Sequence, residues 1–253
     1  MARNSTPGKG VVVVTGAAGG LGRVYCLGLA REGYAVVAAD LADPSAVAAE
    51  VAAAGGECLG VEVDVADERS TLSLAEAALE RFGRIDALVN NAAYYTAIVK
   101  APFDEIPLAE WERCFAVNVR GTWLCCRAVA PAMKAQRSGK IVNVSSTTVP
   151  TGAEGFLHYV ASKAAIVGLT RSLARELGGW NVAVNTLTPD YIAFDRDYDN
   201  RQAGLAGALA EQRCLRRELV PEDMVGTLVY LVGSGSDFVT GQNFHVNGGR
   251  VFQ

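Results

Sequence analysis

Val11-Val12-Val13-Val14-Thr15-Gly16-Ala17-Ala18-Gly19-Gly20-Leu21-Gly22 is the stretch that decides the fold of this chain. Its four valines form a short, apolar, β-branched run, which is typical of a strand buried on both faces. A glycine-rich turn follows, and the apolar spacing then predicts a helix from Leu21 to Arg31 that ends before Gly33. This order of strand, turn and helix predicts the first half of a strand–helix–strand unit.

The glycines of this turn suit close contact with a pyrophosphate. They let the backbone turn tightly and let an anion approach the helix N-terminus, where free N–H groups and the helix dipole favour negative charge. A glycine-rich turn alone is a weak signal, but its position after the first strand makes it much stronger. We therefore predict that Gly16, Gly20, Leu21 and Gly22 contact a dinucleotide cofactor.

Strand-like and helical segments alternate along the rest of the chain. Further strands are expected at Ala35–Ala39, Leu59–Val63, Ala87–Val89, Ile141–Val144, Val182–Leu187 and Gln242–Val246. Helices are expected near residues 44–54, 67–82, 107–135 and 157–178 and from Glu222 to Leu231. The alternation predicts an α/β fold, a parallel sheet with helices on both faces. Without a repeat or a composition break, residues 1–253 are expected to form one domain with a flexible N-terminus at residues 1–9.

Residues 190–218 depart from this alternation. The segment begins with polar and aromatic residues and continues with a more helical piece from Ala203 to Glu218. An insertion of this size after a late strand often covers a site, so we interpret residues 190–218 as a substrate lid. The alternative is an ordinary surface excursion.

Composition excludes several classes of protein. The net charge of −4 and the lack of a basic stripe argue against a nucleic-acid partner. No apolar run is long enough to span a membrane, and the N-terminus lacks the apolar core of a signal peptide. The six cysteines show no ligand-like spacing and are expected to be reduced thiols in a cytoplasmic protein. With only two histidines, we expect no metal site.

Asp40 ends the second predicted strand, at the distance from the glycine turn where an acid meets the ribose hydroxyls. A carboxylate there accepts hydrogen bonds from a diol and repels a 2′-phosphate. Neither Gly19 nor Leu41 is a basic residue that would offset this repulsion. The sequence therefore favours NAD over NADP, and the alternative is that Asp40 only caps the next segment.

Tyr159 and Lys163 lie four residues apart on a predicted helix and so share one face. An unperturbed tyrosine has a pKa near ~10, and a nearby ammonium favours the phenolate and lowers that pKa. The pair alone is weak evidence for catalysis, because the same spacing occurs by chance on many solvated helices.

The combined pattern resembles the short-chain dehydrogenase/reductase family. It consists of Thr15-Gly16-x-x-x-Gly20-x-Gly22, Asn90-Asn91-Ala92, Asn118, Ser146 and Tyr159-x-x-x-Lys163, and the likeness runs from about Gly10 to Gly249. The resemblance implies a single-domain, Rossmann-type, doubly wound parallel sheet, a nicotinamide cofactor, and a homotetramer or homodimer. It also implies cofactor contacts at Asp64, Val65, Asn91, Ala92, Pro189 and Ile192, in addition to Tyr159 and Lys163.

Four residues carry the chemistry that the resemblance implies. Ser146 is expected to hold the substrate oxygen, and Tyr159 to give a proton to that oxygen or take one from it. Lys163 would lower the pKa of the phenol and bind the nicotinamide ribose. Asn118, a poor helix former inside a predicted helix, would hold a water linked to the lysine. Ser145 is the competing serine, and spacing to Tyr159 favours Ser146.

The chain departs from the family pattern at three positions. Ala93 replaces the glycine that often follows Asn-Asn-Ala, which is a mild change. Asp190 stands where a glycine usually follows proline, and Phe194 stands where a threonine is expected. Cofactor affinity or lid closure is therefore expected to differ from the family norm.

Aromatic residues dominate the expected substrate pocket. Its candidates are Tyr94, Tyr95, Thr148, Phe156, Tyr191 and Phe194. They favour an apolar or aromatic ketone or secondary alcohol, although several could simply pack the lid against the body. No arginine is obviously placed to bind an acid, though Arg196, Arg201 and Arg213 lie in the lid.

The leading hypothesis is an NAD-dependent oxidoreductase that interconverts a secondary alcohol and a ketone. A ketoreductase for 3-oxoacyl or polyketide-like substrates is the second reading, and Asp40 disfavours it. A regulatory protein that binds NAD without turnover is the third, and the presence of Ser146, Tyr159 and Lys163 argues against it.

Overall fold

Seven strands form one sheet in the computed structural model, which describes residues 8–193 and 204–252. They are β1 (Val11–Thr15), β2 (Ala35–Asp40), β3 (Cys58–Glu62), β4 (Ala87–Asn90), β5 (Gly139–Val144), β6 (Val182–Pro189) and β7 (Asn243–Val246). The spatial order is β3-β2-β1-β4-β5-β6-β7, and every neighbouring pair is parallel. This order reverses direction between β1 and β4, which confirms the expected doubly wound, Rossmann-type sheet.

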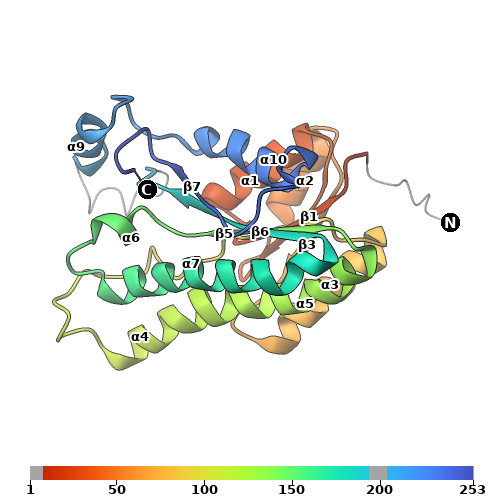
Figure 1. Ribbon diagram of the computed structural model, residues 1–253, viewed down its shortest axis with the longest axis horizontal. Coiled ribbons are helices and arrows are strands. Elements are labelled where there is room, and N and C mark those ends of the chain that lie inside the picture. Colours follow the sequence, from red (N-terminus) through yellow and green to blue (C-terminus); the bar gives the residue numbers. More distant parts are fainter. Residues whose placement is uncertain (1–7, 194–203, 253) are drawn as a thin grey trace.

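Helices cover both faces of the sheet (Figure 1). On one face lie α1 (Gly20–Arg31), α2 (Ser45–Ala53) and α10 (Val225–Val232). On the other lie α3 (Glu68–Phe82), α4 (Leu108–Phe115), α5 (Thr122–Gln136) and α7 (Leu157–Leu177). Two shorter helices, α6 (Thr148–Thr151) and α9 (Leu205–Gln212), lie at one end of the molecule, on the left of Figure 1. Among the described residues, no helix is long and apolar enough to cross a membrane.

The core explains why the four valines of β1 begin the fold. All five residues of this strand are buried, and their side chains alternate between two apolar clusters. Val12 and Val14 pack with α1 and α10, whereas Val11 and Val13 pack with α3 and α5. A central parallel strand therefore needs apolar residues at every position, as the unbroken valine run predicted.

The helix predicted for residues 107–135 runs without a break from Leu108 to Gln136, but its middle is wider than an α-helix, which the sequence did not indicate. A π-helical turn, η1 (Ala116–Gly121), separates α4 from α5 and contains Asn118. Gly121 lies against β3's exit loop, where an added Cβ would approach Val65 to 2.9 Å. Wide turns of this kind often occur at functional sites.

The lid region is also less helical than predicted. The expected helical piece from Ala203 to Glu218 shortens to α9, because the chain becomes extended at Arg213, whose side chain is buried. Leu205 and Leu209 of α9 face the same cavity as Tyr159, so the interpretation of residues 190–218 as a lid remains a prediction with this support.

A buried polar chain fixes α7 to the sheet. Asn90 Nδ2 of β4 donates to Asn143 Oδ1 of β5 over 2.8 Å, and Asn143 Nδ2 donates to Thr170 Oγ1 of α7 over 2.9 Å. The hydroxyl of Thr186 of β6 donates to the same Thr170 oxygen over 3.0 Å. Buried hydrogen bonds of this kind hold one arrangement of helix and sheet, and so help to set the position of Tyr159 at the start of α7.

Candidate active site

Two adjoining cavities lie beyond the carboxyl ends of β1 and β4. The glycine-turn cavity has a volume of about 510 Å³ and is lined by eight predicted cofactor residues, which are Gly16, Gly20, Leu21, Asp40, Asp64, Val65, Asn91 and Ala92. The Tyr159 cavity has a volume of about 320 Å³ and is lined by residues that include Ser146, Tyr159 and Lys163. Leu21, Asn91, Ala93 and Tyr95 line both cavities, so the two cavities are neighbours that share a wall.

The glycine turn has a shape that only glycine permits. Gly16 has a φ of +67°, and an added Cβ would come within 2.8 Å of the Ala92 Cα. Gly22 does not line the cavity, because it packs α1 against the turn, where an added Cβ would lie 1.9 Å from the Gly16 carbonyl oxygen. The resulting open first turn of α1 faces the cavity, and its unpaired N–H groups suit a pyrophosphate.

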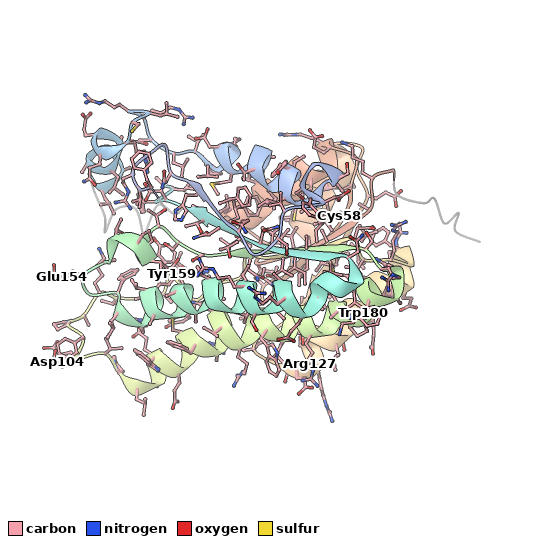
Figure 2. The ribbon with its side chains drawn as sticks, in the orientation of Figure 1. Cys58, Asp104, Arg127, Glu154, Tyr159 and Trp180 are labelled. Atoms are coloured by element: carbon pink, nitrogen blue, oxygen red, sulfur yellow. The ribbon has the colours of Figure 1, made fainter. Side chains whose placement is uncertain are left out.

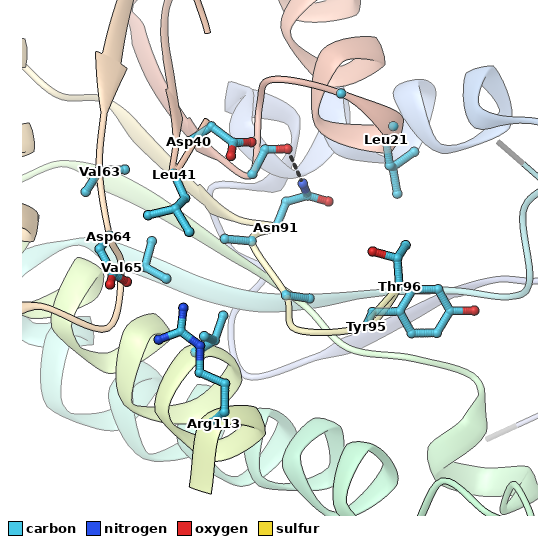
Figure 3. Close-up of a pocket in the computed structure, with 16 residues that line it drawn as sticks. Leu21, Asp40, Leu41, Val63, Asp64, Val65, Asn91, Tyr95, Thr96 and Arg113 are labelled. Atoms are coloured by element: carbon cyan, nitrogen blue, oxygen red, sulfur yellow. Dashed lines mark hydrogen bonds between the residues drawn. The ribbon is translucent and has the colours of Figure 1, made fainter. Parts of the chain in front are cut away.

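Asn91 joins this turn to the end of β4. Its Nδ2 donates to the carbonyl oxygens of Thr15 and Gly16 over 3.0 and 3.1 Å, the second of which Figure 3 marks. The Thr15 hydroxyl accepts hydrogen bonds from the backbone N–H groups of Asn91 and Ala92, each over 3.1 Å. The floor of the cavity is therefore held rigid before any ligand binds.

The Asp40 carboxylate is fixed at the rim of the glycine-turn cavity. Its Oδ2 accepts from the backbone N–H of Ala18 over 2.8 Å, and its Oδ1 accepts from that of Ala42 over 3.0 Å. Arg113 is the one cation among the lining residues, and Figure 3 shows it beside Val65, away from Asp40. The residues that line this cavity fit a dinucleotide cofactor.

Tyr159 and Lys163 lie on the first turns of α7, at the end of the sheet near α6 (Figures 1 and 2). The Lys163 Nζ lies 5.8 Å from the centroid of the Tyr159 ring. Tyr159 is 7% exposed and Lys163 is 3% exposed. Burial lowers the pKa of Lys163 from 10.5 to about 8, because the desolvated ammonium is disfavoured.

The structure separates the two serines that the sequence left in competition. The Ser145 hydroxyl is buried and donates to the Lys163 carbonyl oxygen over 2.9 Å. The Ser146 hydroxyl lies in the Tyr159 cavity and accepts hydrogen bonds from the N–H and hydroxyl of Thr148 over 3.1 and 2.9 Å. Ser146 therefore keeps its own proton available for another oxygen in the cavity.

Asn118 lies behind the cavity and does not line it. Its Nδ2 donates to the Ser162 hydroxyl over 2.9 Å, and its Oδ1 accepts from the backbone N–H of Tyr94 over 2.7 Å. Ser162 in turn donates to the Tyr159 carbonyl oxygen over 2.7 Å. Asn118 thus ties the loop after β4 to the helix that carries Tyr159.

Most of the predicted substrate residues gather in the Tyr159 cavity. Thr148 and Tyr191 line it, together with an aromatic cluster in which the rings of Tyr95 and Phe156 lie 5.1 and 5.7 Å from that of Tyr159. Pro189 and Ile192, which were predicted as cofactor contacts, line this cavity and not the glycine-turn cavity. Tyr94 lines neither cavity and packs beside this cluster. Phe194 lies outside the described residues.

Sequence reasoning missed two of the charged residues at this cavity, Lys100 and Arg250, and named Asp190 only as a departure from the family pattern. Lys100, Asp190 and Arg250 line the cavity, and Asp190 forms ion pairs with Arg213 and Arg250. Arg250 is thus an arginine at the cavity that the sequence analysis did not name. The unusual Asp190 was the available signal, because a buried carboxylate requires a cation.

Comparison with known proteins adds relatives over almost the whole chain. The family described as enoyl-(acyl carrier protein) reductase matches residues 16–250. The 3-oxoacyl-[acyl-carrier-protein] reductase of Synechocystis sp. is 35% identical over 247 residues, which cover 95% of this chain and 96% of the relative.

Two solved structures share the fold. One, described as an NAD(P)-dependent gluconate 5-dehydrogenase from Beutenbergia cavernae with NADP bound at low occupancy, has a TM-score of 0.87 and 37% identity, covering 98% of each chain. The other, an NAD⁺-bound xylitol dehydrogenase, has a TM-score of 0.89 and 30% identity, covering 97% of this chain and 100% of that one.

Proposed function

The chain belongs to the short-chain dehydrogenase/reductase family, and we propose that it is an NAD-dependent oxidoreductase that interconverts a secondary alcohol and a ketone. One observation carries this proposal: Ser146, Tyr159 and Lys163 line a cavity that adjoins the glycine-turn cavity and shares four lining residues with it. A substrate carbon bound near the phenol would then lie beside the reactive end of a dinucleotide. The aromatic lining supports a substrate with an apolar or aromatic body.

The protein's part in the reaction is proton transfer and positioning. When bound, the nicotinamide supplies or accepts the hydride. Ser146 donates a hydrogen bond to the substrate oxygen, and Tyr159 gives that oxygen a proton during reduction or takes one during oxidation. Lys163, held beside the ring, favours the phenolate by its charge. Asn118 acts indirectly, because it orients Ser162 and the first turn of α7.

The position of Asp40 supports NAD rather than NADP. Both carboxylate oxygens already accept backbone hydrogen bonds that hold the group at the cavity rim. A ribose diol can donate to this fixed acceptor, whereas a 2′-phosphate there would meet a like charge without a nearby cation among the lining residues. NAD is therefore the cofactor we propose, with Gly16, Gly20, Leu21, Asp64, Val65, Asn91 and Ala92 in contact with it.

A second candidate is a ketoreductase for 3-oxoacyl substrates on a carrier protein. The name and 35% identity of the Synechocystis relative favour it. The two candidates share Tyr159 chemistry and differ in the substrate and in the cofactor, since Asp40 argues for NAD. Comparison of a small ketone with a 3-oxoacyl thioester, each with NADH and NADPH, distinguishes them.

We also propose that the chain forms a homotetramer or homodimer through the helices α4, α5 and α7. Leu108 is exposed at the start of α4, and Trp123 is 45% exposed on α5. Association would remove this apolar surface from water. Light scattering on the purified protein tests the proposal, and a monomer at micromolar concentration would contradict it.

The central test is a spectrophotometric screen of NAD⁺ with a panel of secondary alcohols. Tyr159→Phe should lower kcat/KM by about 10² to 10⁴-fold, because the acid/base group is lost. Tyr230→Phe, on α10 and outside both cavities, is the matched control and should keep full activity. Binding of NADH without turnover of any substrate would instead support a regulatory protein, and full activity of Tyr159→Phe would refute the catalytic assignment.

A further inference from the structure

A buried ion-pair cluster borders the Tyr159 cavity and takes no part in the proton transfer described above. The Asp190 Oδ2 accepts hydrogen bonds from Arg213 Nε and Nη2 over 3.2 and 2.9 Å. The Asp190 Oδ1 accepts one from Arg250 Nη2 over 2.8 Å. The side chains of Asp190 and Arg213 are each 2% exposed, and that of Arg250 is 13% exposed.

The charges of this cluster do not cancel, because one carboxylate lies between two guanidinium groups. All three nitrogens of Arg213 donate to protein groups, since it also donates to the carbonyl oxygens of Arg217 and Tyr191 over 3.0 and 3.2 Å. Arg250 differs, because it lines the cavity together with Ser146 and Tyr159. The excess positive charge therefore lies on the cavity side of the cluster.

Arg250 also retains hydrogen-bonding capacity. Its Nε is buried and has no hydrogen-bond partner among the residues that the structure describes. A desolvated guanidinium that the protein satisfies only in part is costly, and its presence calls for an explanation. The negative charge of a ligand group in the cavity would offset this cost, while the Nε itself stays enclosed by protein.

The backbone before Arg250 is built to hold it in place. Gly248 and Gly249 have φ values of +63° and +78°, which favour glycine. The Asn247 side chain closes the turn by accepting from the Gly249 N–H over 2.8 Å and donating to the Val251 carbonyl oxygen over 2.9 Å. The guanidinium is thus positioned in advance, which lowers the entropic cost of binding a ligand.

Other charged groups at the cavity point to the same ligand. Lys100 and Lys163 also line it, and Asp190 is the one carboxylate among the described lining residues. Its two oxygens are already bound by Arg213 and Arg250. A cavity of about 320 Å³ lies near the lower end of the range for small-molecule sites, roughly 300 to 1,000 Å³.

We propose that Arg250 binds a carboxylate of the substrate, so that the enzyme acts on small hydroxy acids and the corresponding oxo acids. This proposal rests on the proposed function and specifies its substrate class. In the oxidation, the carbinol carbon gives a hydride to NAD⁺ and the hydroxyl gives its proton to Tyr159, which yields the oxo acid, NADH and a proton. The carboxylate stays unchanged and fixes the orientation of the substrate, and guanidinium geometry matches it better than an ammonium would.

The test compares acids with their own methyl esters, which keep the carbon skeleton and remove the charge. Steady-state oxidation of 3-hydroxybutyrate, mandelate and 3-hydroxy-3-phenylpropionate is measured beside that of the three esters. For the best acid, wild-type kcat/KM should exceed that of its ester by about 10² or more, because a site built for a polar group rejects the analogue that lacks it. Arg250→Met should remove this preference by lowering acid turnover while ester turnover changes less than about threefold.

Arg250→Lys should restore part of the preference through charge, and Arg216→Met, which alters an exposed arginine outside the cavity, should leave it intact. Equal turnover of acids and esters by the wild type, or an unchanged acid preference in Arg250→Met, would overturn the proposal and leave the oxidoreductase assignment standing.

If no compound in the panel is turned over, the proposal is tested by calorimetric titration of the three oxo acids and their esters into the NADH-loaded protein. Acid binding that Arg250→Met abolishes supports the carboxylate site, and equal or absent binding of both overturns it.

Discussion

The Lys163 Nζ donates a hydrogen bond of 2.8 Å to the carbonyl oxygen of Val144, the last residue of β5. This bond holds the lysine under the Tyr159 ring and at the carboxyl end of the sheet. The protein thereby keeps an ammonium group in a buried place where solvation is poor, and the pKa of Lys163 falls to about 8. The arrangement suits catalysis and costs stability.

Lys163→Met should therefore stabilise the cofactor-free protein while it removes activity. The lowered pKa corresponds to a cost of about 3 kcal/mol in the native state at neutral pH, of which the loss of the Val144 hydrogen bond offsets a part. We expect a net gain of about 1 to 3 kcal/mol in the free energy of unfolding, measured by urea denaturation at pH 7.

The stability advantage of Lys163→Met is expected to depend on pH in one direction. Between pH 8 and 10.5 the unfolded wild type binds more protons at Lys163 than the native state, so wild-type stability at this group rises with pH. The advantage of Lys163→Met should be complete below pH 8 and should shrink toward pH 10.5. An advantage that is absent at pH 7, or that grows with pH, would contradict the assignment of a buried ammonium.

Asp40 is predicted to set cofactor choice. Asp40→Ser together with Leu41→Arg removes the carboxylate and adds a cation at the cavity rim, where both positions lie. The ratio of kcat/KM with NAD⁺ to that with NADP⁺ should fall by about 10² to 10³. NAD⁺ loses a hydrogen-bonded contact with the carboxylate, and NADP⁺ no longer meets a like charge beside its 2′-phosphate. Leu72→Arg on α3, at another exposed leucine, is the control and should leave the ratio unchanged.

Ser162 is predicted to position Tyr159 through its bonds to Asn118 and to the Tyr159 carbonyl oxygen. Ser162→Ala should lower kcat by about tenfold with little change in KM, because the phenol is displaced while the binding groups remain. Ser172→Ala removes an exposed hydroxyl from the same helix and should be neutral. A change of KM alone would show that Ser162 affects binding and not the orientation of the base.

Asp190 and Arg213 are predicted to stabilise the folded protein mainly through their interaction with each other. Arg213→Met should lower the free energy of unfolding by about 3 kcal/mol, because it leaves a buried carboxylate with one cation in place of two. Asp190→Gly, which restores the family residue, should cost a similar amount by leaving two guanidinium groups together. The double variant should lose less than the sum of the single losses, and additive losses would show that the two groups do not interact.

Local patterns were sufficient for most of the architecture. The valine run, the glycine turn and the alternation of strand-like and helical apolar spacing predicted the strands and both layers of helices, because each of these signals lies within one element. The π-helical turn η1 was not predicted, and we have no local signal for it. The shortening of α9 was not predicted because Arg213, where the chain becomes extended, is bound by Asp190 from elsewhere in the chain. Tyr94 was misplaced for a similar reason: sequence position put it in the right loop but could not say which way its side chain packs.

By itself, the sequence determined the reactive groups and their local spacing. Glycines at the turn and a tyrosine one helical turn from a lysine are properties of short segments, and short segments have few conformations open to them. Only the tertiary structure decided which charges meet. Asp190 reaches Arg213 across 23 positions and Arg250 across 60 positions, and no local periodicity links them. Asp190 is buried, and a buried charge needs partners of opposite charge. The fold supplies two arginines for this one carboxylate, so the cluster at the cavity wall carries a net positive charge.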